Sequence, residues 1–457
     1  MKPLTTASPP DRERIAEAAF VGSCAVYLLG LLLNARAIAS LAPLALLLAG
    51  AVQPGARSRL RLIRYNGPAL MLMAIYPMLL VSGLWSEDLK EWRHVVTRYL
   101  PFLAVPLAFC MARPLTTRQR YGLGLLFVMA TTAVALGTVI QFLLNYQTES
   151  DRISRSQNIT AITGVFHIHF GIMIGLASFF AWALARAAAA YGQPWRARLL
   201  RATAVGLALA LHLLAYRTGL LVFYALIVVI AIRTLVLERR YAVGVLLLLL
   251  LILAPALAYM TLEPVMRRVE NTRYDLNRFL NGEDINHYSL AQRLAAWTNA
   301  ATLIRQHWAI GVGPADIPLE MERQYERRSF GLAPENRVLL HNQYLFALLS
   351  LGVVGLAWLL GLLFVPLTHR AVRQDFCAVV FLCGIAAAML VDTPFSLHIG
   401  LHLFLSLYAL LLVGPRHREL LATASPSRSQ PATEQLGIAG TLPFLCQPTP
   451  QSGPFPV

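Results

Sequence analysis

Residues 241–261 read YAVGVLLLLLLILAPALAYMT, a run of 21 residues that contains no charged side chain. A helix needs about 20 mostly apolar residues to cross the hydrocarbon core of a bilayer. The composition of the whole chain agrees with this run, since 57% of the residues are hydrophobic and 14% are charged, whereas soluble domains are about 25% charged. The sequence therefore predicts an integral membrane protein.

Eleven further apolar stretches accompany this run. We predict an all-α, polytopic fold of about twelve transmembrane helices, near residues 17–35, 37–53, 68–85, 95–112, 121–144, 161–185, 202–216, 219–236, 241–261, 342–366, 375–391 and 397–414. The first stretch lacks a small-residue cleavage site, so we interpret it as a retained span.

The basic residues indicate an orientation. One set of alternate connections, including both termini, carries 22 Lys and Arg, while the short connections of the other set carry seven. Basic residues accumulate on the cytoplasmic side. Both termini are therefore expected inside and the long segment 262–341 outside. The same distribution explains the net charge of +16, and because no basic stripe interleaved with aromatic residues is present, we exclude nucleic-acid binding.

The predicted organisation has five regions: an inner N-terminus, a first membrane region with spans 1–9, an outer helical segment, a second membrane region with spans 10–12 and an inner, disordered tail. Their respective residues are 1–16, 17–261, 262–341, 342–414 and 415–457. In the outer segment, Ser289 and Gln292 have the spacing of a capping box that opens a helix. Gly311–Pro314 predicts a turn, and Asp316 is expected to cap a second helix.

Three residues on the outer side are the main candidates for chemistry. Arg217 lies in the tight junction Tyr216-Arg-Thr-Gly219, Arg293 lies in the first outer helix, and His341 stands where the outer segment enters span 10. A guanidinium has five donors that suit phosphate oxygens, and a histidine side chain can accept a proton near neutral pH. The simpler interpretation of each is a polar side chain at the membrane interface.

Other polar residues carry weaker signals. His398 and His402 are four residues apart in span 12, a spacing that could hold a metal ion, but no carboxylate joins them at helical spacing. His167 and His169 are two apart and point to different helix faces. Candidates for the outer mouth are Asp392, Arg93 and Arg98. Two cations and a base form a plausible site for transfer from a lipid diphosphate. Because the high-energy bond arrives with the lipid, we expect no cofactor.

Together these residues and their order give the chain a likeness to a known family. It resembles the O-antigen ligase family over roughly residues 17–414, most closely from about 203 to 365. The resemblance rests on Tyr216-Arg217-Thr218-Gly219, on Ser289, Arg293 and Trp297 followed by Gly311-Val-Gly-Pro314, and on His341-Asn342.

The resemblance implies a glycosyltransferase of the bacterial inner membrane. Such ligases move O-antigen polysaccharide from undecaprenyl diphosphate to lipid A–core oligosaccharide, on the periplasmic side, by inverting transfer without a metal. By this resemblance His341 is the catalytic base, Arg217 and Arg293 bind the diphosphate, and Arg98 is a further substrate-binding residue.

Several alternatives remain open at this stage. An O-antigen polymerase, which uses lipid-linked saccharide as both donor and acceptor, shares the topology. A protein O-glycosyltransferase usually has a large additional outer domain. A twelve-span secondary transporter would carry ionisable residues near the midplane and two related halves, whereas the apolar runs of this sequence are nearly free of charge.

Overall fold

The computed structural model describes residues 9–149 and 159–424, and within these ranges the regular structure is helical, with no β-strand. The longer helices of the first half are α1 (Pro9–Leu32), α2 (Arg36–Ala51), α6 (Leu89–Arg98), α7 (Pro101–Met111), α8 (Thr117–Leu144), α10 (His167–Ala190) and α11 (Pro194–Leu213). Those of the second half are α12 (Arg217–Val236), α13 (Tyr241–Thr261), α14 (Glu263–Asn281), α15 (Ser289–His307), α16 (Ile317–Arg327), α17 (Gln343–Phe364), α19 (Phe376–Ala388), α20 (His398–Tyr408) and α21 (Gly414–Ala424). Short helices α3 (Ala56–Leu60), α4 (Gly67–Met73), α5 (Ile75–Ser82) and α18 (Arg370–Gln374) lie between them.

Eight helical segments of the described residues are long and apolar enough to cross a membrane, and a bent pair would make a ninth. The chain is therefore a polytopic helical membrane protein, while the count of twelve stays a prediction. The expected span 68–85 is divided between α4 and α5, and the expected span 375–391 contains a helix of only 13 residues, α19. In α11, three arginines precede the apolar residues 202–213, which leaves fewer apolar residues than the roughly 20 that a straight span needs.

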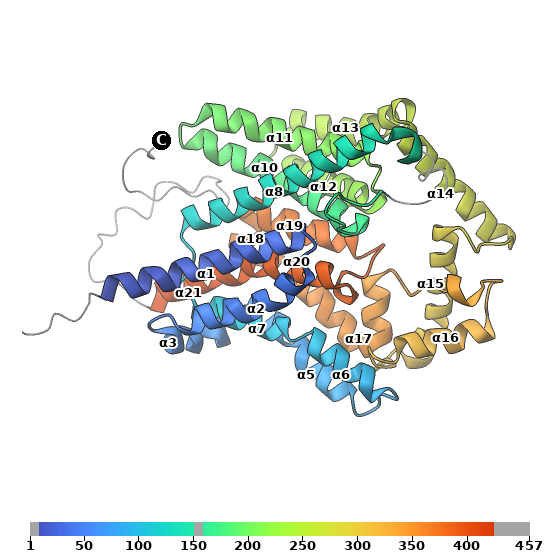
Figure 1. The fold of residues 1–457 in the computed structure, drawn as a ribbon, viewed down its shortest axis with the longest axis horizontal. Helices are drawn as coiled ribbons and strands as arrows, with labels where there is room; N and C mark the ends of the chain where they lie inside the picture. Colours follow the sequence, from blue (N-terminus) through green and yellow to red (C-terminus); the bar gives the residue numbers. More distant parts are fainter. Residues whose placement is uncertain (1–8, 150–158, 425–457) are drawn as a thin grey trace, which may run out of the picture.

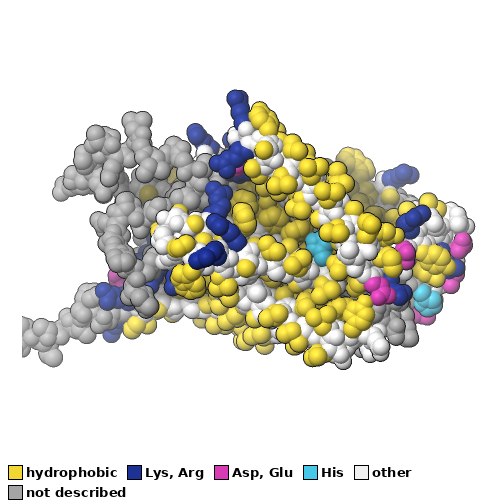
Figure 2. All heavy atoms as spheres, turned by 90° about the horizontal axis from the view of Figure 1, so that it is seen from above, with side chains coloured by type: hydrophobic (Ala, Val, Ile, Leu, Met, Phe, Trp, Pro, Cys, Tyr) yellow, Lys and Arg dark blue, Asp and Glu magenta, His cyan; other side chains and the backbone are white. Residues whose placement is uncertain are grey.

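The molecule is an elongated helical bundle whose two ends are formed by different sets of helices. In Figure 1 the start of α1 and helices α3 and α21 lie at one end, and α14, α15 and α16 lie at the other. Figure 2 shows hydrophobic side chains over the middle of one face, with acidic side chains at the end that carries α14–α16. This distribution is what a bilayer around the middle of the bundle would require.

Helix α10 forms the centre of the bundle. In the apolar 18-residue stretch of α10, 89% is buried inside the bundle, whereas only 11% of the corresponding stretch of α13 is buried. Helix α13 therefore presents nearly all its side chains outward. Gly171 of α10 and Gly219 of α12 allow a close approach of the two helices, because a Cβ built on Gly219 would lie 2.7 Å from the carbonyl oxygen of Gly171. The close contact fixes the start of α12, and with it Arg217.

Helix α17 is broken where the segment 262–341 packs against it. Gly352 has φ +62° and ψ −155°, a conformation that is essentially restricted to glycine. The N–H groups of Val312 and Gly313 donate to the carbonyls of Leu349 and Ser350, both at 2.9 Å, so the predicted Gly311–Pro314 turn satisfies carbonyls that the break releases. The turn after α15 is thereby locked to α17.

We expect Gly352→Ala to destabilise the protein strongly. A Cβ at this position would lie 2.1 Å from the carbonyl oxygen of Ala309, and alanine does not tolerate the backbone conformation. The loss of unfolding free energy should be at least about 2 kcal/mol, measured as a lower melting temperature in detergent. Gly361→Ala is the matched control, since it lies in the same helix and its Cβ would have no neighbour closer than 3.8 Å. Equal melting temperatures for the two variants would contradict the prediction.

Both expected helix caps are wrong in detail, although the helices are present. Helix α15 begins at Ser289, but neither Ser289 nor Gln292 makes the reciprocal bonds of a capping box, and the side chain of Gln292 donates to the carbonyl of Asn286 instead. Asp316 stands at the N-cap of α16 without capping it. The carboxylate of Asp316 instead accepts bonds from Ser86 Oγ and from the N–H groups of Glu87 and Asp88. A long-range contact has replaced the local one.

Two further expectations concern the termini. Helix α1 begins at Pro9, inside the N-terminal region expected at residues 1–16, and α21 occupies the first ten residues of the expected disordered tail 415–457. The remainder of the tail and residues 1–8 lie outside the described residues, as do Arg152 and Arg155, which entered the charge count.

Candidate active site

Arg217 is the first residue of α12 and is placed by a very short junction. Helix α11 ends at Leu213, Ala215 has φ +48°, and Tyr216 is the N-cap of α12. The Nε and Nη2 atoms of Arg217 are buried, and they find no hydrogen-bond partner within residues 9–149 and 159–424. A buried cation whose N–H groups lack hydrogen-bond acceptors raises the free energy of the fold unless a ligand supplies the acceptors. The side chain of Arg217 is therefore suited to binding an anion.

Two further arginines join Arg217 around one cavity. The cavity encloses about 160 Å³ between α10, α12, α14 and α15, and is lined by His167, Ile168, Arg217, Thr218, Leu221, Arg268, Thr272, Ser289, Leu290, Arg293 and Val391. Arg268 comes from α14 and is 5% exposed. Three guanidinium groups therefore converge from three helices, two of them candidates from the sequence and one of them, Arg268, not anticipated.

The electrostatics of the cavity favour an anionic ligand. Burial and the neighbouring charge of Arg217 lower the pKa of Arg268 to about 10, which leaves it cationic at neutral pH. Burial also lowers the pKa of Arg293. The nearby carboxyl of Asp275 accepts a bond from the N–H of Leu290 at 2.9 Å, and burial raises its pKa. With the two carboxylates of Asp275 and Asp392 near three guanidinium groups, the surroundings of the cavity carry an excess of positive charge.

Helix α15 connects this cavity to His341. Arg293 Nη1 donates to the carbonyl of Val391 at 3.1 Å, and Trp297 Nε1, one helical turn later, donates to the carbonyl of Leu340. These two carbonyls belong to the residues that directly precede Asp392 and His341. One face of α15 therefore fixes the arginine-lined cavity and the candidate base together.

His341 is held by a buried carboxylate. The Nδ1 atom of His341 lies 3.5 Å from Asp392 Oδ1, and the side chain of His341 is 31% exposed while that of Asp392 is fully buried. Burial alone would raise the pKa of Asp392, but the hydrogen bond from His341 and the nearby imidazole of His169 lower it below its usual range. An ionised Asp392 favours a proton on Nδ1, which leaves Nε2 of His341 free as an acceptor.

Asn342 shapes the backbone on which His341 stands. Its side-chain oxygen accepts bonds from the N–H groups of Tyr344 and Leu345, and its amide nitrogen donates to the carbonyl of Leu390 at 2.9 Å. Asn342 is therefore the N-cap of α17 and ties it to the segment that carries Asp392. His341 itself has φ +43°, a left-handed conformation that few non-glycine residues adopt.

The comparison with known families decides the identity of this region of the chain. Residues 202–360 match a protein family described as O-antigen ligase. The matched range contains Arg217, Arg268, Arg293 and His341. These four residues therefore lie in a region that is similar to the O-antigen ligase family. The family resemblance recognised from the sequence is confirmed, and no curated protein matches the chain at a significant level.

Some residues of the site lie outside the range that matches the O-antigen ligase family. Asp392 and His167 come from beyond residues 202–360, so helices on both sides of the matched range complete the site. Asp392 was only a weak candidate from the sequence. Its position before Pro394, at the end of an apolar run, was its one visible signal.

The spacing of residues around Arg268 in the sequence indicates that this arginine lies on a buried helix face. Val265, Arg268, Thr272 and Asp275 follow the spacing of one helix face, and three of these four are buried. A charged residue on the otherwise buried stripe of an amphipathic helix is a candidate for function. The neighbouring Arg267 lies off this stripe and pairs with Glu263.

The other candidates from the sequence do not line the arginine cavity. Arg98, at the end of α6, does not line it and makes an ion pair with Glu91 at 3.5 Å. Arg93 donates to the carbonyl of Leu89 in the same helix. His398 and His402 contact the hydroxyls of Ser40 and Tyr27, and the described residues contain no cluster of three or more metal-ligating side chains.

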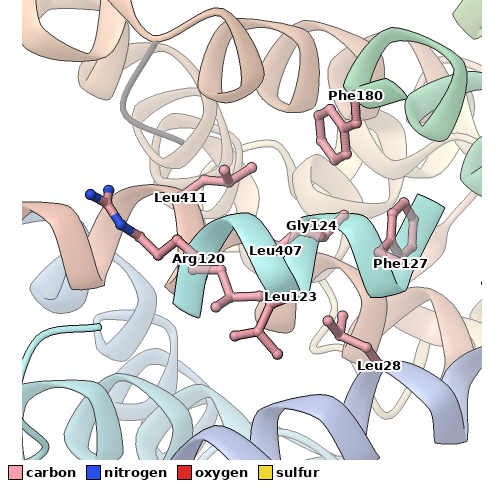
Figure 3. A pocket seen from close by; sticks show the side chains of 9 residues that line it. Leu28, Arg120, Leu123, Gly124, Phe127, Phe180, Leu407 and Leu411 are labelled. Carbon is pink, nitrogen blue, oxygen red and sulfur yellow. The ribbon is translucent and has the colours of Figure 1, made fainter. Parts of the chain in front are cut away.

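A second cavity, between α1, α8, α10 and α20, has a different character. It encloses about 30 Å³ and its lining is apolar except for Arg120. Figure 3 shows the guanidinium of Arg120 directed away from the rings of Phe127 and Phe180. This cavity is a small gap between packed apolar side chains. It does not have the convergent polar groups that line the arginine cavity.

Proposed function

We propose that the protein is an O-antigen ligase. It transfers O-antigen polysaccharide from undecaprenyl diphosphate to lipid A–core oligosaccharide. One observation carries the proposal: Arg217, Arg268 and Arg293 line one cavity, and α15 ties that cavity to the His341–Asp392 pair. A cationic cavity beside a base suits transfer from a diphosphate to a hydroxyl.

The proposed reaction uses the residues as follows. His341 Nε2 takes the proton from an acceptor hydroxyl, and that oxygen attacks the anomeric carbon of the donor sugar from the side opposite the diphosphate. The bond from the anomeric carbon to the phosphate oxygen breaks, and undecaprenyl diphosphate leaves. Arg217, Arg268 and Arg293 stabilise the charge that develops on it, without a metal ion. Asp392 keeps His341 oriented and stabilises the imidazolium that forms.

We further propose that the protein has about twelve spans in the bacterial inner membrane. Both termini would be cytoplasmic, and the helical segment 262–341 periplasmic. The three-to-one excess of basic residues on one set of connections supports this orientation. The lipid-linked donor already carries a high-energy diphosphate bond. The transfer can therefore take place on the periplasmic side of the membrane, away from ATP.

The test is reconstitution of the purified protein with lipid-linked polysaccharide and lipid A–core. We expect a conjugate of the two, visible as a mass shift of the lipid A–core. Growth of the lipid-linked saccharide in the absence of lipid A–core would show a polymerase instead. A protein that joins neither pair of substrates but accumulates a labelled solute in proteoliposomes would be a transporter.

A further inference from the structure

A partly exposed cluster of two tyrosines and one arginine lies on α14 and at the start of α15, beside the arginine cavity. We call Tyr274, Arg278 and Tyr288 the Tyr–Arg platform. The rings of Tyr274 and Tyr288 are 5.5 Å apart at an interplanar angle of 61°, and the guanidinium of Arg278 lies 5.2 Å and 4.7 Å from their respective centroids. Tyr274 is 52% exposed, so an aromatic surface is open to solvent in the outer segment.

A hydrogen bond and an ion pair to the connection between α14 and α15 hold Arg278 of the platform in place. Arg278 Nη1 donates to the carbonyl of Asp284 at 2.8 Å, and its Nε lies 3.3 Å from the carboxylate of Glu283. Asn286 fixes the same connection through bonds to Asp284, Gly331 and Ala333. These bonds position the guanidinium against which both rings pack, and a side chain that is already held in place loses little conformational entropy when a ligand binds.

The platform is also close to the site of transfer. Tyr288 directly precedes Ser289, and Tyr274 is two residues from Thr272, and both Ser289 and Thr272 line the arginine cavity. The bond from Leu290 to Asp275 joins the two helices between them. The platform therefore adjoins the part of α14 and α15 that forms the cavity wall, although its own three residues do not line the cavity.

We propose that the Tyr–Arg platform binds a sugar residue of the polysaccharide or oligosaccharide chain that enters the cavity, an inference that rests on the proposed function. Polarised C–H groups on one side of a pyranose suit the electron-rich faces of tyrosine rings, and the adjacent carboxylates and guanidinium supply partners for hydroxyls. A simple anion is a poorer fit, because Glu283 already neutralises Arg278. A lipid chain is a poorer fit because charged groups surround the rings.

Direct binding tests the proposal on the full-length protein in nanodiscs. The two probes are donor polysaccharide released from its lipid and core oligosaccharide released from lipid A, each titrated by calorimetry. We expect Tyr274→Ala to weaken the binding of one probe about fivefold to tenfold, while Tyr274→Phe, which keeps the ring, binds nearly as the wild type does. Trp308→Ala is the matched control, a similarly exposed aromatic residue of the same segment.

The probe that loses affinity identifies the source of the sugar, donor or acceptor. In the transfer assay the same variant should raise KM for that substrate and leave kcat unchanged, which a loss of packing would not do selectively. Wild-type affinity of Tyr274→Ala for both probes, or failure of the wild type to bind either, would overturn the platform. Binding without any transfer activity would overturn the proposed function and leave the platform standing.

Discussion

His341→Ala is expected to lose about 10²- to 10⁴-fold in kcat for the joining of polysaccharide to lipid A–core. The variant removes the partly exposed imidazole that contacts the fully buried carboxylate of Asp392 and that α15 ties to the arginine cavity. Without a base, the acceptor hydroxyl must lose its proton to water as it attacks. Binding of the lipid-linked donor should change little, because the three arginines remain. The measurement is single-turnover transfer by purified protein at saturating donor.

The backbone of His341 calls for a second variant. Its φ of +43° strains alanine but is tolerated by asparagine. We therefore expect His341→Asn to fold as the wild type does and to be equally inactive, which separates catalysis from folding. His307→Ala, at the exposed end of α15, is the matched control and should retain full activity. Near wild-type transfer by His341→Asn would remove the proposed base.

The class of fold could be predicted from the sequence because a helix that crosses the hydrocarbon core of a bilayer must be mostly apolar. Long apolar runs predicted a polytopic helical membrane protein, and the boundaries of α13 coincide with the predicted 241–261. Interruptions inside apolar runs were not visible in the same way. The break at Gly352 interrupts a run of leucine and valine, and it depends on hydrogen bonds to Val312 and Gly313, some 40 residues earlier in the chain.

The candidate site was predictable where a short junction or a helix end displays a polar residue. Arg217 and His341 stand at such ends, and the structure puts Arg217 and Arg293 on one cavity. Arg268 and Asp392 were harder to recognise, since each acts through tertiary contacts with elements distant in sequence. Arg98 was a candidate for the outer mouth by its position, and its substrate-binding role came from the resemblance; in the structure it pairs with Glu91 on α6.

Adjacent arginines in α14 provide the sharpest test of the cavity. Arg268 is buried on the cavity wall, whereas Arg267 is 40% exposed and bonds to Glu263 at 2.8 Å. We expect Arg268→Ala to lower kcat/KM for the lipid-linked donor about 10²- to 10³-fold, the usual effect of removing one donor to a developing charge. Arg267→Ala should lower it less than about twofold, because an exposed ion pair contributes about 0–1 kcal/mol. Both variants remove the same charge from the same helix.

The comparison also separates local contacts from the overall field of the protein. If diffuse positive charge drew the donor to the membrane surface, the two variants would behave alike and salt would weaken both equally. If instead Arg268 contacts the diphosphate, Arg268→Lys should recover only a fraction of the activity, since an ammonium cannot reproduce the planar donors of a guanidinium. Equal activities of Arg268→Ala and Arg267→Ala would argue against contact between Arg268 and the leaving diphosphate. Arg217→Ala and Arg293→Ala should group with Arg268→Ala, because the developing charge is shared by all three guanidinium groups of one cavity.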